Sequence, residues 1–83
     1  MNELTRLPTA FTAEIAKIYA SNAHSGVIPV GRRANVLGEV ARVRAKYGQK
    51  VASLRAAGHK TDAVERQLAR IENDPAQQLP NAA

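Results

Sequence analysis

Basic side chains are concentrated in the middle third of the chain, and their type and spacing favour the binding of an anionic partner. Residues 32–60 hold eight Lys and Arg residues against one acid, Glu39, whereas residues 1–31 are neutral and residues 61–83 carry a net charge of −2. A segment this positive attracts phosphate backbones, anionic surfaces or acidic protein patches. The competing interpretation is a solvated helix face that pairs with the acids of residues 61–83. The candidate residues for binding nucleic acid or an acidic partner are Arg32, Arg33, Arg42, Arg44, Lys46, Lys50 and Arg55.

Catalytic and metal-binding chemistry has no comparable support in the sequence. The chain has no cysteine, and its two histidines, His24 and His59, lie far apart without an acid at a ligand spacing. The serines lack the context of a nucleophile elbow. Residues 26–33 have the glycine spacing of a phosphate-binding loop, but two arginines stand where that loop has Lys and Ser or Thr. We therefore expect no enzyme activity, no metal site, no cofactor and no small-molecule substrate.

Three segments repeat apolar residues at the α-helical period, which predicts an all-α, three-helix domain. The longest segment covers about residues 32–57, and Gly58 follows its end as a helix-stopping residue. We expect it to be one long central helix, although a break near Gly48 would also fit the pattern. Its large apolar residues, at a mean spacing of about 3.6, are Val36, Val40, Val43, Tyr47, Val51 and Leu54.

Shorter helices are predicted on either side of the central one. A stripe of Phe, Ile and Tyr residues predicts a first helix over about residues 9–24, starting after Pro8. A stripe of Val, Leu and Ile residues predicts a third helix over about residues 62–74. A single domain over residues 9–74 is therefore expected between a flexible lead, residues 1–8, and a flexible tail, residues 75–83.

Helix 32–57 carries a second stripe, made of small residues, on the side opposite its large apolar residues. Surface alanine alone fits a good helix former, but each glycine in a helix interior costs about 1 kcal/mol relative to alanine. We therefore expect a face on which another helix packs closely, with self-association into a homodimer as one outcome. The members of this stripe are Ala34, Gly38, Ala41, Ala45, Gly48, Ala52 and Ala56.

The chain is short, rich in Ala and Arg and free of Cys, and it contains the stretch VIPVGRRANVLGEVARVRAKYG. In these features the whole chain resembles the small accessory proteins encoded by filamentous phages and prophages of GC-rich bacteria. The resemblance implies a regulatory or host-modulating role, such as control of the lysogenic state. It implies no particular site residue.

We interpret the chain as a non-enzymatic regulatory or accessory protein that acts through helix-mediated protein–protein interaction or self-association. The alternative is a DNA-binding transcriptional regulator that uses the basic central helix. Arg32-Arg33-Ala34-Asn35 could begin the recognition helix of a helix-turn-helix, although the connector before it is longer than that motif's turn. No apolar run approaches the roughly 20 residues of a membrane span, and the start lacks a signal-peptide pattern, so we expect a cytoplasmic location.

Overall fold

The computed structural model describes residues 3–74 of the chain. Its elements are α1 (Glu3–Asn22), a short 3-10 helix η1 (Val30–Arg32), α2 (Arg33–Ala56) and α3 (Asp62–Glu72). The only β-pairing over this range is an isolated bridge between His24 and Val27. The predicted all-α, three-helix fold with a long central helix is therefore confirmed. The predicted flexible tail, residues 75–83, lies outside the described residues.

Helix α1 begins six residues earlier than the sequence pattern predicted. Residues 3–8 are helical and Pro8 lies inside the helix, so the predicted start after Pro8 is wrong. An interior proline costs roughly 3 kcal/mol in a helix, but Leu7 is only 3% exposed and Pro8 is buried too. Burial of these side chains offsets the lost backbone hydrogen bond. The helix also ends at Asn22, two residues before the predicted end.

A tight reversal follows α1 and starts the chain back toward α2. Ser25 and Gly26 both have positive φ, at 53° and 81°. The backbone N–H of His24 donates to the carbonyl of Val27 at 2.7 Å, and the reciprocal bond measures 3.2 Å. Two successive left-handed residues suit a two-residue hairpin turn. Ile28, just after the turn, is 1% exposed and closes this end of the core.

Helix α2 is continuous through Gly48, which resolves the break that the sequence left open. All six residues of its large apolar stripe are buried or half-buried, as the 3.6-residue spacing predicted. Beyond its last residue, Gly58 has a φ of 97° and donates its N–H to the carbonyl of Arg55 at 3.0 Å. This is the left-handed helix stop for which glycine is preferred.

Helix α3 is the least buried of the three helices. Its apolar stripe, Val64, Leu68 and Ile71, packs against the core but is only partly buried. Thr61 precedes the helix at 1% exposure, and its hydroxyl accepts a hydrogen bond from Nε of Arg55 at 3.1 Å instead of capping α3. The end of α2 is therefore tied to the start of α3 by a side-chain hydrogen bond.

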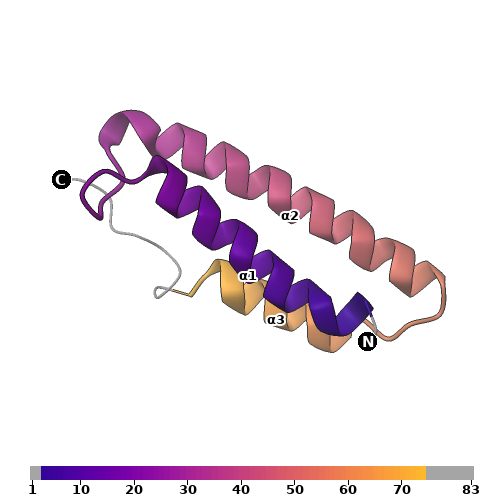
Figure 1. Ribbon diagram of the computed structural model, residues 1–83. Coiled ribbons are helices and arrows are strands. Elements are labelled where there is room, and N and C mark those ends of the chain that lie inside the picture. Colours follow the sequence, from indigo (N-terminus) through magenta and orange to yellow (C-terminus); the bar gives the residue numbers. More distant parts are fainter. Residues whose placement is uncertain (1–2, 75–83) are drawn as a thin grey trace.

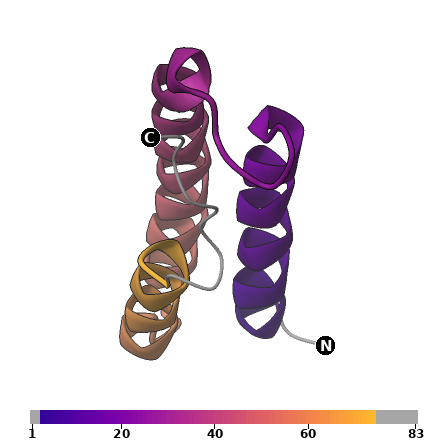
Figure 2. The ribbon, with the colours of Figure 1, turned by 90° about the vertical axis from the view of Figure 1, so that its left-hand side faces the viewer.

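The described residues form a rod of 46 × 19 × 18 Å. Helices α1 and α2 run antiparallel along the length of the rod, and the shorter α3 lies alongside them at one end (Figure 1). Helix α1 packs against both α2 and α3 (Figure 2). The rings of Phe11 and Tyr47 meet edge to face in the core with 5.1 Å between centroids. Ten residues join this antiparallel pair, three of them in η1, and the pair does not have the steep crossing of a helix-turn-helix.

No helix within residues 3–74 is long and apolar enough to cross a lipid bilayer. The apolar residues of these helices instead form stripes, and the largest side chains of each stripe face the other helices. The remaining surface carries exposed Lys and Arg residues together with many exposed Ala residues.

Candidate binding surface on helix α2

Three of the seven basic residues singled out from the sequence are paired within the chain. Arg44 donates hydrogen bonds to Oε1 of Glu72 on α3. Arg55 reaches the carboxylate of Glu65 at 2.6 Å and also lies 3.6 Å from Asp62. The two arginines therefore bridge α2 to α3, as the solvated-face interpretation predicted for individual residues.

The third paired cation, Lys46, joins α2 to α1. Its ammonium lies 2.7 Å from Oε1 of Glu14. Hydrogen bonds from Lys46 and then Tyr47 hold the pKa of the Glu14 carboxyl below its usual value. Burial, together with the hydrogen bond to Glu14, raises the pKa of Tyr47 to about 12. Glu14 is therefore fixed as a carboxylate and Tyr47 as a neutral phenol at neutral pH.

Of the other four candidates, Arg33 is half-buried at the start of α2, and the remaining three, Arg32, Arg42 and Lys50, are in none of these ion pairs. Arg42 and Lys50 are exposed on α2, and the Lys50 ammonium lies 5.3 Å from the centre of the Tyr47 ring. Arg32 is exposed at the end of η1. The seven candidates therefore do not form one site, because they point to several sides of α2.

The small-residue face of α2 is open along its whole length. We use this name for Ala34, Gly38, Ala41, Ala45, Gly48, Ala52 and Ala56, all of which are exposed. A Cβ atom added at Gly38 or at Gly48 would meet nothing within 4 Å. Within residues 3–74, no helix packs on this face, so the predicted close approach is not made by another helix of this part of the chain.

Two large apolar side chains lie exposed beside the small-residue face, near the start of α2. Leu37 is 72% exposed and Val30, in η1, is 61% exposed. Leu37 is one helical turn from both Ala34 and Ala41. Leu37 is not among the residues predicted to form a site, although it is the one large apolar residue of α2 that falls outside the buried stripe. Its position outside the 3.6-residue spacing of the buried stripe is the sequence signal that could have identified it as exposed.

A groove of about 260 Å³ separates α2 from α3. Phe11, Tyr47, Val51 and Leu68 give it an apolar floor, and Gly48 lies at its edge. Its charged lining residues include Arg44 and Glu72, which are already paired with each other, and Glu65, which is paired with Arg55. The groove therefore presents apolar surface between two closed ion pairs and holds no converging set of reactive groups.

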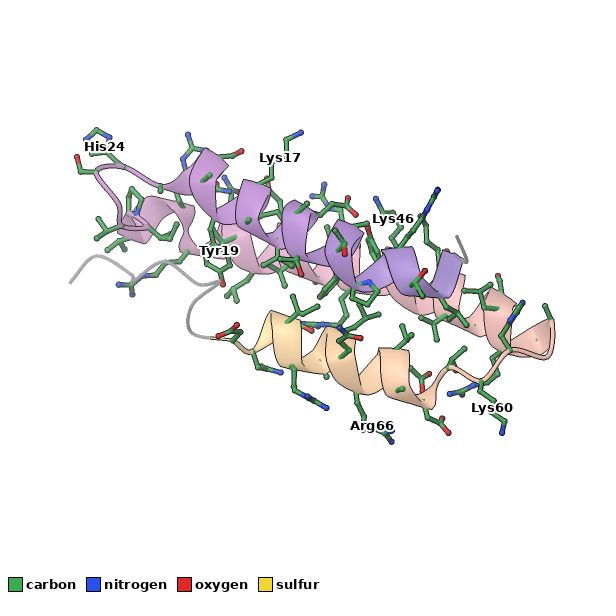
Figure 3. All side chains as sticks on the ribbon, turned by 60° about the horizontal axis from the view of Figure 1, so that its bottom comes forward. Lys17, Tyr19, His24, Lys46, Lys60 and Arg66 are labelled. Carbon is green, nitrogen blue, oxygen red and sulfur yellow. The ribbon has the colours of Figure 1, made fainter. Side chains whose placement is uncertain are left out.

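Metal-binding groups do not gather in the described part of the chain. No cluster of three or more His, Cys, Asp or Glu side chains occurs between residues 3 and 74. His24 lies in the turn after α1 and points away from the helices (Figure 3), whereas His59 follows α2 at the opposite end of the rod.

Comparisons with family models, with curated protein sequences and with solved structures find no match to this chain.

Proposed function

We propose that this protein is a non-catalytic regulatory or accessory protein that docks a helix on the small-residue face of α2. The docked helix belongs to a protein partner or to a second copy of the chain. Arg42 flanks the face on one side and lies outside the ion pairs described above, whereas Arg44 on the other side is already paired with Glu72. A partner helix with acidic residues would complement Arg42, whereas a second copy would place like charges opposite each other. A protein partner is therefore the favoured occupant.

The observation that carries this proposal is the pair of glycines inside α2. Each interior glycine costs roughly 0.5–1 kcal/mol relative to alanine. Neither Gly38 nor Gly48 has a neighbour that a methyl group would touch, so packing within residues 3–74 does not require either of them. Close approach of a helix from another molecule supplies the missing reason, because glycine and alanine let two helix backbones come near each other.

A non-catalytic binding role agrees with the regulatory or host-modulating role that the resemblance to phage and prophage accessory proteins implies. A small regulator of lysogeny or of a host process acts by occupying a surface of its target. Leu37 and Val30 add the exposed apolar side chains that could anchor such a contact.

Photo-cross-linking in the cells that produce the protein tests this proposal. A photoreactive side chain at Ala45, in the middle of the face, should give an adduct of discrete mass. An adduct of twice the chain mass identifies a second copy, and any other mass identifies a partner. Replacing Ala41 and Ala52 by Leu on the same chain should abolish the adduct, because the larger side chains hold the partner helix away.

The matched control uses the exposed back of α1, where Ala13, Ala16 and Ala20 also face solvent. A photoreactive group at Ala16, or Leu at Ala13 and Ala20, should neither produce nor remove the adduct. Equal adducts from positions 45 and 16, or none from position 45, would show that the face is not a docking site.

DNA binding through the basic helix is the second candidate function. The observation that favours it is that Arg42 and Lys50 project from α2 among polar neighbours, outside the ion pairs that bridge α2 to α3. The cations left after pairing support contact with phosphates, which carries no sequence information by itself.

A further inference from the structure

Four cations from two helices line one side of the α1–α2 pair. We call Lys17 of α1 and Arg42, Lys46 and Lys50 of α2 the cation row. The three α2 members recur every four residues, so they stand about 6 Å apart along the helix. Lys17 lies one turn from Glu14, the residue that Lys46 contacts. Figure 3 shows Lys17 and Lys46 projecting to the same side of the molecule.

Two carboxylates lie close to the cation row, and they are too few to neutralise its four positive charges. Glu14 is held by Lys46 at 2.7 Å. Glu39 is half-buried and accepts a hydrogen bond at 3.1 Å from the side-chain amide of Asn22, which is itself buried. Lys17, Arg42 and Lys50 are exposed and remain outside these contacts.

The surface beside the row is polar. Asn35, Gln49 and Ser53 are exposed on the same side of α2. The exposed Leu37 lies roughly 140–180° away around the helix from the α2 members of the row. Protein interfaces depend on buried apolar or aromatic anchors, whereas Arg, Lys, Ser, Asn and Gln are the side chains that contact phosphates and sugars. The composition of this side therefore favours a polyanionic backbone over a protein.

Aromatic residues distinguish double-stranded from single-stranded partners. Phe11 and Tyr47 are 2% and 3% exposed, and Tyr19 is half-buried against the core. Stacking of unpaired bases needs exposed aromatic rings. None of these three rings is exposed beside the cation row. We infer that the cation row binds the phosphate backbone of duplex nucleic acid without reading its sequence. This inference deepens the second candidate function, DNA binding. It shares Arg42 with the edge of the small-residue face, whereas Lys50 lies on another side of α2 and Lys17 lies on α1.

Salt-dependent binding to a 25-base-pair DNA duplex, followed by fluorescence anisotropy, tests the inference. Neutralising three phosphates with Lys17, Arg42 and Lys50 predicts a slope of log K against log salt of about −2.7. The double variant Arg42→Gln/Lys50→Gln should reduce this slope to about −0.9 and weaken binding at 50 mM salt on the order of 100-fold. Sequence changes in the duplex should leave both values unaltered.

A variant that is expected to strengthen duplex binding makes the test sharper. Glu14→Gln releases Lys46 from its ion pair, so it should tighten binding at low salt and make the slope steeper by about 0.9. The matched control is Arg66→Gln/Arg70→Gln on α3, which removes the same charge from exposed residues. Arg66 projects from the opposite side of the molecule in Figure 3, so this control should retain most of the affinity.

Several outcomes would overturn the inference. They are no binding to the duplex at 20 mM salt, equal losses from the row variant and the α3 control, or weaker binding by Glu14→Gln. Binding to phosphatidylserine vesicles or to a glutamate-rich helical peptide, but not to the duplex, would also reject it and identify a different anionic partner. Circular dichroism of each variant must match that of the unaltered protein, because every substituted residue is exposed or part of a surface pair.

Discussion

At the scale of single residues, the glycines of α2 are the positions where stability and the proposed docking function oppose each other. Gly38→Ala should stabilise the isolated chain by about 0.5–1 kcal/mol, because it removes backbone freedom from the unfolded state and its methyl group meets no atom within 4 Å. Urea denaturation monitored by circular dichroism measures this change. A destabilised Gly38→Ala variant would mean that something already packs on the face in the isolated chain.

Charge also has to be understood residue by residue, and here the sequence was a poor guide. The count along the chain correctly located the basic segment, but it could not pair Arg44 with Glu72 or Lys46 with Glu14, because those contacts depend on which helices touch. It also missed Lys17, which belongs to a neutral segment and joins the basic residues of α2 only through the antiparallel packing of α1.

At the scale of elements, hydrophobic periodicity predicted the regular helix α2 and missed the true start of α1, where a proline lies inside the helix. The buried stripe of α2 has an unbroken 3.6-residue period, so its burial could be read directly from the sequence. The start of α1 could not, because Pro8 outweighed the signal from Leu4 and Leu7, which continue the same apolar stripe toward Glu3. Tertiary packing decided this boundary against local preference.

A pair of leucines tests the boundary of α1. Leu7→Ala should destabilise the protein by about 2–5 kcal/mol, because a 3%-exposed side chain leaves a cavity when it is cut back. Leu37→Ala is the matched control: Leu37 is 72% exposed, so the same substitution should change stability by no more than about 0.5 kcal/mol. Chemical denaturation of both variants makes the comparison. Similar small effects would mean that residues 3–8 do not pack as part of α1.

At the scale of the whole molecule, the described residues form a narrow rod whose long helix is covered on one side and bare on the other. Helix α3 is shorter than α1 and α2 (Figure 1). The groove described above lies between α3 and α2. The sequence predicted that α2 has two faces, but it could not say what faced the smaller side chains. That question depends on where α1 and α3 pack, and no helix within residues 3–74 covers these smaller side chains.

Spin labelling measures most directly whether the small-residue face is open. The chain has no cysteine, so Ala45→Cys and Ala16→Cys each give a single labelling site, one on the face and one on the back of α1. In dilute protein, the nitroxide at position 45 should be as mobile as the one at position 16. A nitroxide that is immobilised at position 45 alone, in the monomer, would show that the chain covers this face itself and would contradict the account.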